Sequence, residues 1–178
     1  MKKISIINKN EKFSNCSISD EKAEGRLISV NEKFLAISDK NKNNEEKIII
    51  VDSSQSKRIK PDLPGLNWKN KKIYDIEFSP FNNNLLASCY EDNSVLLWDI
   101  PKNGLDKTIT KEKTIYNKHN NKVNVVNFNQ SEPDKICSST CDGDIHVWNL
   151  EKKKDNYISL KADNNLTYAC WNLKGNWS

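Results

Sequence analysis

Short hydrophobic segments separated by polar turns recur along the middle of the chain. Apolar residues alternate within 73–78, and a turn rich in Ser, Pro and Asn separates them from the run Leu85–Ala87. A second polar turn precedes another apolar segment at 95–97. Period-two alternation and short apolar runs between turn residues are typical of β-strands. No stretch keeps a helical period, so the pattern predicts an all-β protein.

The same pattern occurs a second time, 50 residues further along the chain. A fixed period of this size is typical of repeat architectures in which each unit is one supersecondary element. Three pairs of equivalent residues share the offset: Phe78 and Phe128, Asp92 and Asp142, and Trp98 and Trp148.

Partial units flank the two clear ones. Upstream, the segments 27–30, 34–37 and 48–52 are predicted strands of a degenerate first unit, with a polar hairpin loop at 39–46. Residues 102–118 are predicted to form a long polar connector. We therefore expect one incomplete domain over residues 1–178, with units at about 25–60, 66–100 and 118–160 and the start of a further unit at 165–178.

Composition narrows the class of protein. The chain has 178 residues, of which 36% are hydrophobic and 29% charged, and no apolar run approaches the roughly 20 residues of a membrane helix. The apolar run at 4–7 is too short for a signal peptide, so we expect a cytoplasmic protein. The net charge of +4 is too small to indicate nucleic-acid binding, although it suits an acidic protein partner.

The cysteines and histidines do not have the spacing of a metal site. The cysteine number is odd and no secretory signal precedes them, which favours free thiols. Cys137 and Cys141 are four residues apart, and the only histidines are His119 and His146. Zinc sites use closely spaced pairs repeated elsewhere. We therefore expect no metal and no other cofactor. The five cysteines are Cys16, Cys89, Cys137, Cys141 and Cys170.

A unit that ends in Trp-Asp, with Asp six residues and Ser ten residues before the Trp, resembles the WD repeat of β-propellers. In that family a His near the start of the unit completes a hydrogen-bonded set, and Lys69 stands at this position in the first clear unit. Such a set links the strands of one blade, so its role is structural. The residues predicted for it are Ser88, Asp92, Trp98, His119, Ser138, Asp142 and Trp148.

Three of these residues, His119, Ser138 and Asp142, have the side-chain types of a hydrolase triad. Ser138 lies within a predicted strand and lacks the Gly-x-Ser-x-Gly elbow of such enzymes. The equivalent set at Ser88 and Asp92 has no base, and no phosphate-binding loop occurs. We therefore expect no catalytic residues and no enzyme activity.

Several segments resemble the coronin family in particular. Residues 30–36 (Val-Asn-Glu-Lys-Phe-Leu-Ala) are similar to a segment of the family's first blade, and residues 80–89 and 91–95 to its next blade. The most specific match is Trp98 to Leu105, which is close to the coronin pattern Trp-x-Ile-Pro-Glu-Asn-Gly-Leu. Residues 168–175 are similar to the strand that follows, so the resemblance covers about residues 25–178.

The resemblance implies a seven-bladed propeller that binds filamentous actin in the cytoplasm as part of the cytoskeleton. Coronins oligomerise through a C-terminal coiled coil that these residues do not include. At about 40–50 residues per blade, the chain holds about three blades and the start of another. The family also tends to have a basic actin contact upstream of the first strand, where our ungapped alignment places Ser17.

An acidic filament would meet clustered cations, and the loops offer two sets. Arg58 is the strongest candidate, because the only other arginine is Arg26 and a guanidinium pairs well with carboxylates. In a lysine-rich chain the same residues also suit solvated loops. A general WD-repeat scaffold with a non-actin partner is the alternative function. The candidate contacts are Lys57, Arg58, Lys60, Lys69, Lys71 and Lys72.

The tryptophans outside the Trp-Asp positions have less specific signals. Trp171 and Trp177 are predicted to belong to the blade core, because aromatic side chains mostly serve burial. Trp68 lies in a polar segment and suits either a core or a binding role. The charges at 111–113 and 152–154 are predicted to be ordinary connector charge.

Overall fold

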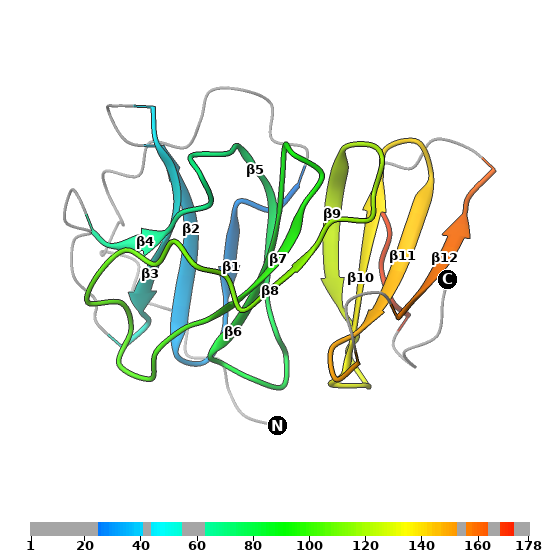
Figure 1. Cartoon of the computed structure of the whole chain (residues 1–178). Helices are drawn as coiled ribbons and strands as arrows, with labels where there is room; N and C mark the ends of the chain where they lie inside the picture. Colours follow the sequence, from blue (N-terminus) through cyan, green and yellow to red (C-terminus); the bar gives the residue numbers. More distant parts are fainter. Residues whose placement is uncertain (1–24, 41–43, 55–62, 153–155, 164–167, 173–178) are drawn as a thin grey trace, which may run out of the picture.

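The computed structural model describes residues 25–40, 44–54, 63–152, 156–163 and 168–172. These residues form three four-stranded antiparallel sheets that stand side by side (Figure 1). The all-β prediction is confirmed. Within the described residues, no helix is long and apolar enough to cross a membrane.

Each sheet uses four strands that are consecutive in the sequence. The first sheet consists of β1 (Ile28–Val30), β2 (Phe34–Lys40), β3 (Glu46–Asp52) and β4 (Gly65–Leu66). The second consists of β5 (Ile73–Phe78), β6 (Leu85–Tyr90), β7 (Val95–Asp99) and β8 (Thr114–Tyr116). The third consists of β9 (Val123–Phe128), β10 (Lys135–Thr140), β11 (Asp144–Asn149) and β12 (Tyr157–Lys161).

The first strand of each sheet lies against the first strand of its neighbour, with β1 beside β5 and β5 beside β9. The β1–β2, β5–β6 and β9–β10 turns lie at the bottom of Figure 1, which we call the lower end. The β6–β7 and β10–β11 turns lie at the opposite, upper end, together with the β4–β5 and β8–β9 connections. This is the blade arrangement expected of a propeller segment.

The 50-residue repeat appears as equal register in the second and third sheets. Leu86 is opposite Trp98 in the second sheet, and Ile136 is opposite Trp148 in the third. Both tryptophans have an exposed fraction of 0%. Trp98 packs in the core between the first and second sheets, and Trp148 in the core between the second and third. Burial of these aromatic side chains therefore helps to join neighbouring sheets.

The sequence pattern predicted three strands per unit and missed the fourth. The missed strands are short or exposed: β4 has two residues, β8 has three, and four of the five residues of β12 are exposed. Two or three residues are too few to show alternation of hydrophobic and polar residues, and the exposed β12 has no buried face that requires it. The predicted loop at 39–46 is also shorter than expected, because Asp39 and Lys40 pair with Lys47 and Glu46 across β2 and β3.

The predicted connector after β7 is more ordered than a polar loop. It returns to the first sheet, where the Ile109 N–H donates to the Gly65 carbonyl and the Asn67 N–H donates to the Ile109 carbonyl, both at 2.9 Å. Leu105 and Ile109 pack on the core between the first two sheets. The coronin-like Ile-Pro-Lys-Asn-Gly-Leu segment thus lies at a junction between blades. Its Gly104 has a φ of +81°, which glycine adopts without strain.

Candidate functional site

The second sheet contains a buried hydrogen-bond chain around Ser88. The Trp98 indole N–H donates to Ser88 Oγ at 2.8 Å, and the Ser88 hydroxyl donates to the Tyr90 hydroxyl at 3.2 Å. All three side chains are buried, and burial raises the pKa of Tyr90. Tyr90 therefore takes the position next to serine that a His occupies in the WD set.

The carboxylate of Asp92 is bound by a residue that the sequence left unassigned. The Trp68 indole N–H donates to Asp92 Oδ2 at 3.1 Å, and Trp68 is buried. Lys69, which stands at the expected His position, turns outward with a φ of +50°. Its Nζ lies 4.2 Å from the centroid of the Trp68 ring. The blade thus compensates for the missing His with a neighbouring indole.

The third sheet builds the equivalent site with histidine. The Trp148 indole N–H donates to Ser138 Oγ at 2.8 Å, and Ser138 Oγ is 2.7 Å from His119 Nε2. The ring of His146 stacks on His119 with centroids 3.9 Å apart. Sequence reasoning missed His146, although its position two residues before Trp148 puts it on the same face of β11.

The expected bond between His119 and Asp142 is not formed. Asp142 instead accepts from the Thr140 hydroxyl at 2.6 Å and from Asn121 Nδ2 at 2.6 Å, and these bonds hold its pKa at about 2. His119 Nδ1 and His146 Nδ1 have no hydrogen-bond partner among the described residues. Burial, followed by the nearby His146, lowers the pKa of His119 to about 3.

This geometry does not suit nucleophilic catalysis. Ser138 has an exposed fraction of 0%, so a substrate cannot reach its hydroxyl. Its oxygen already accepts from Trp148, and the His119 ring lacks the carboxylate that orients the base of a triad. The Ser138 oxygen instead links β10 to Trp148 of β11 and to His119, which precedes β9.

A second cluster, which sequence reasoning missed, joins all three sheets. Arg26 lies just before β1 and reaches two carboxylates of β5. Its Nη2 is 2.8 Å from Asp75 Oδ2, and its Nη1 is 2.7 Å from Glu77 Oε1. The same carboxylates accept backbone N–H groups of β9, from Val126 at 2.9 Å and from Phe128 at 2.6 Å. We call Arg26, Asp75 and Glu77 the inter-blade clamp.

The clamp is partly buried and tightly held. Burial alone would lower the pKa of Arg26, but its hydrogen bonds with Asp75 and the negative charge of that residue raise it. Burial raises the pKa of Glu77 in spite of the nearby guanidinium. Gly25 precedes the clamp at a close approach: a Cβ there would lie 2.4 Å from the Tyr74 carbonyl oxygen. The rarity of arginine in the chain was the sequence signal that could have marked Arg26.

The candidate actin contacts divide into two groups. Lys57, Arg58 and Lys60 lie outside the described residues. Lys69, Lys71 and Lys72 lie in the β4–β5 connection at the upper end. In this second group, Lys71 Nζ is 3.7 Å from Glu91 Oε1, and Lys72 Nζ is 5.9 Å from the centroid of the Tyr74 ring.

A further lysine reaches the same place from the third sheet. Lys122 Nζ lies 4.3 Å from the centroid of the Tyr74 ring, so two cations from different sheets meet one aromatic side chain. We call Lys69, Lys71, Lys72 and Lys122 the upper basic cluster. Lys72 and Lys122 meet at Tyr74, which packs on the core between the second and third sheets. Lys69 lies over Trp68, which packs in the core between the first and second sheets.

The cysteines have the structural character expected of free thiols. Cys89 and Cys137 are buried, and burial raises the pKa of both, that of Cys137 to about 12. Cys141 and Cys170 are free and exposed, and Cys16 lies outside the described residues.

No group of three or more potential metal ligands occurs in the part of the chain that the structure describes.

Comparison with known proteins agrees with this geometry. Residues 66–99 and 110–149 match the family described as "WD domain, G-beta repeat". The WD40 domain of Toxoplasma gondii coronin shares the fold, with a TM-score of 0.83 and 24% identity over 93% of this chain and 42% of that one. A partial WD-repeat propeller is therefore confirmed as the fold.

Curated relatives narrow the family. Coronin-2A of Bos taurus is 26% identical over 83% of this chain, and Coronin-2B of Homo sapiens is 30% identical over 60%. A coronin-like protein of Saccharomyces cerevisiae is 24% identical over 95%. The chain spans only 28%, 22% and 27% of the length of these relatives. These sequence matches support a WD-repeat fragment similar to coronins.

Proposed function

We propose that this chain binds actin filaments through the upper basic cluster. The observation that supports this most directly is the sequence match to coronins across most of the chain. The coronin resemblance implies a filamentous actin partner, and a non-catalytic role suits the inaccessible Ser138 hydroxyl. A cytoskeletal location follows from the same partner.

The geometry of the cluster suits contact with an acidic partner. Lys69 is exposed, and Lys71 is only partly neutralised by Glu91, since both side chains remain about 40% exposed. Stacking on Trp68 and Tyr74 limits where the Lys69 and Lys122 ammonium groups can lie. Cations held in place lose less freedom when a partner binds.

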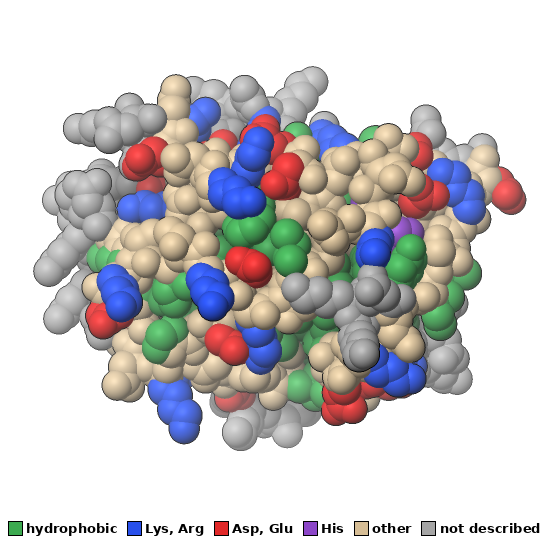
Figure 2. Space-filling model, viewed as in Figure 1, with side chains coloured by type: hydrophobic (Ala, Val, Ile, Leu, Met, Phe, Trp, Pro, Cys, Tyr) green, Lys and Arg blue, Asp and Glu red, His purple; other side chains and the backbone are tan. Residues whose placement is uncertain are grey.

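Charge elsewhere on the surface is mixed. In Figure 2, Lys and Arg side chains alternate with Asp and Glu over the visible face. Mixed surface charge gives little steering toward an acidic filament, whereas a local excess of cations does. In the upper basic cluster four lysines outnumber the neighbouring Glu91 and Asp92. The proposal therefore rests on this local excess and not on the net charge.

The test is co-sedimentation of the full chain with actin filaments at rising salt. Replacing Lys69, Lys71 and Lys72 by Ser should weaken binding on the order of tenfold at low salt, because three cations are lost from one contact. The matched control replaces the exposed Lys102, Lys107 and Lys111 by Ser, which removes the same net charge from the connector. The control should pellet like the parent chain.

Two outcomes would contradict the proposal at different levels. If the parent chain does not pellet at low salt, filament binding is wrong and the general scaffold hypothesis gains support. If both triple variants pellet equally well, filament binding stands but the upper basic cluster is not the contact.

A further inference from the structure

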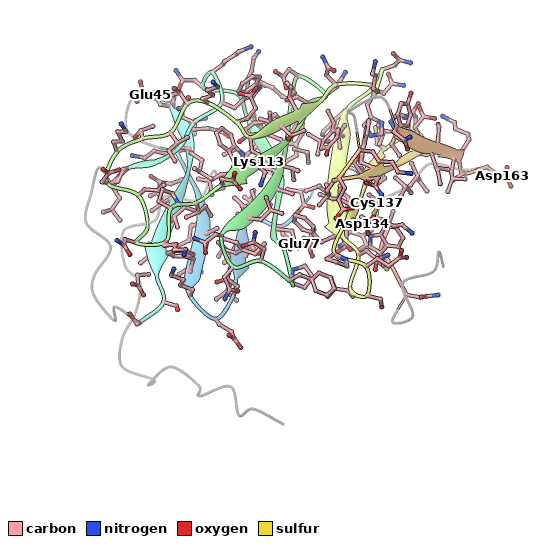
Figure 3. The ribbon with its side chains drawn as sticks, turned by 60° about the horizontal axis from the view of Figure 1, so that its bottom comes forward. Glu45, Glu77, Lys113, Asp134, Cys137 and Asp163 are labelled. Carbon is pink, nitrogen blue, oxygen red and sulfur yellow. The ribbon has the colours of Figure 1, made fainter. Side chains whose placement is uncertain are left out.

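A pocket of about 560 Å³ opens at the lower end, away from the upper basic cluster. The β1–β2 turn and the β5–β6 turn form its two walls, and Gln130 after β9 closes one side. This volume is within the range of about 300–1,000 Å³ that is common for ligand pockets. Figure 3 brings the lower end forward and shows Glu77 near the third sheet.

The floor of the pocket is the exposed side of the inter-blade clamp. Arg26 and Glu77 both line it, and each is fixed by hydrogen bonds to β5 or β9. The walls are also fixed, because Asn31 Nδ2 donates to the Asn83 carbonyl at 3.0 Å and so joins the two turns. The pocket is therefore formed before any partner arrives, which lowers the entropic cost of binding.

The charge of the pocket is opposite to that of the whole chain. Its lining includes one cation, Arg26, and two carboxylates, Glu32 and Glu77. The guanidinium is already paired with Glu77 and with a third carboxylate behind it, Asp75. Glu32 lies on the rim and is exposed. A negative pocket in a chain of net charge +4 favours a cationic occupant.

Apolar side chains stand beside these carboxylates. Phe81 is 49% exposed at the tip of the β5–β6 turn, and Val30 is 66% exposed at the end of β1. Both line the pocket together with the exposed Pro80. Exposed apolar groups next to a charged pocket are common in surfaces that bind peptide side chains, where the apolar part supplies affinity and the charge supplies specificity.

We propose that this pocket binds a Lys or Arg side chain of an extended peptide from a partner protein. The cationic head enters toward Glu32 and Glu77, and an aliphatic neighbour in the peptide packs on Val30 and Phe81. An anionic ligand would meet the carboxylates, and a purely apolar one would leave them desolvated. The site is separate from the proposed filament contact, so the chain can hold a second partner at its lower end.

The experiment uses the full chain and a fluorescent library of hexapeptides with a central arginine flanked by leucine. Fluorescence polarisation measures affinity, and the matched library carries citrulline, which has the shape of arginine without its charge. We expect the arginine library to bind at least about fivefold more tightly, with affinity falling as salt rises. Equal binding of the two libraries, or no binding at millimolar peptide, overturns the proposal.

Variants then locate the contact. Glu32→Gln and Phe81→Ser should each weaken binding about threefold or more, because each removes one half of the proposed contact. The matched controls are Glu91→Gln at the upper end and Ile158→Ser, which is an exposed apolar residue of β12. Both controls should bind like the parent chain. Equal losses in the variants and the controls would show that the peptide binds elsewhere and would overturn the assignment.

Discussion

The second and third sheets solve the same packing problem with different chemistry. In both, a fully buried tryptophan donates its indole N–H at 2.8 Å to a serine ten residues earlier. The second sheet completes this pair with the Tyr90 hydroxyl, and the third completes it with the His119 imidazole. The tryptophan–serine bond is thus the constant part of the blade, and the group beyond the serine can vary.

The difference has a consequence for ionisation. The second sheet contains no histidine, and burial raises the pKa of Tyr90 above its ordinary value, so its set remains uncharged at neutral and acid pH. The third sheet stacks two buried imidazoles whose Nδ1 atoms have no partner among the described residues. Mild acid should therefore protonate the imidazoles of the third sheet, a change that has no counterpart around Ser88 in the second sheet.

The largest expected loss of stability comes from removing the tryptophan of the tryptophan–serine bond. Trp98→Ala and Trp148→Ala should each lower the free energy of unfolding by about 3–5 kcal/mol, because each empties a fully buried site and leaves a serine without its donor. Urea denaturation followed by circular dichroism measures this. Trp171→Ala is the comparison, since Trp171 is buried and its N–H donates to a backbone carbonyl, that of Asn127, in place of a serine hydroxyl.

Equal losses for Trp98 and Trp148 would show that the two sheets depend on the tryptophan to the same degree. A loss below about 1 kcal/mol for one of them would contradict its assignment to the blade core, because a truncation of this size in a packed core costs more.

The sequence predicted the two tryptophans and the strands that carry them. The 50-residue offset placed Trp98 and Trp148, and the strands before them, at equivalent positions in two sheets. Alternation along the chain predicted the inner strands, because their buried faces need apolar residues. The outer strands β4, β8 and β12 were missed, because two are very short and the third is exposed.

Long-range polar contacts could not be predicted from local pattern. Arg26 meets Asp75 across 49 positions of sequence, and no repeat spacing links the two. The replacement of His by Trp68 was hidden for a related reason, since an indole next to the expected position does not match the family motif. Which neighbour fills a vacant hydrogen-bonding position depends on packing, which single-sequence reasoning does not give.

The next largest expected effect is a fall in the free energy of unfolding at acid pH, caused by the histidines of the third sheet. The pKa of His119 is about 3 in the folded chain, against an ordinary value of about 6.5 when unfolded. Between these values the unfolded chain binds more protons, so stability is complete above pH ~6.5 and falls as the pH decreases. We expect a loss of about 2 kcal/mol between pH 7 and pH 5, measured by urea denaturation at each pH.

The control variant is His119→Gln, which keeps a side chain able to bond Ser138 but does not titrate. Its stability should change less than half as much over the same pH range. Asp142 and Asp144 also face His119, and His146 titrates in the same direction, so part of the slope should remain. An unchanged slope in the variant would contradict the role of His119.

The smallest expected loss of stability comes from the bond between Trp68 and Asp92 in the second sheet. The third sheet has no equivalent bond between His119 and Asp142. Trp68→Phe removes the N–H that meets Asp92 and should cost about 1 kcal/mol, because Asp92 is exposed and water can replace the donor. A double-mutant cycle with Asp92→Ala, which removes the acceptor, isolates this bond. The parallel cycle of His119→Gln with Asp142→Ala should show no measurable coupling, because His119 and Asp142 share no hydrogen bond among the described residues. Equal coupling in both cycles would mean that His119 and Asp142 interact in solution as strongly as Trp68 and Asp92 do, which would contradict the difference between the two sheets.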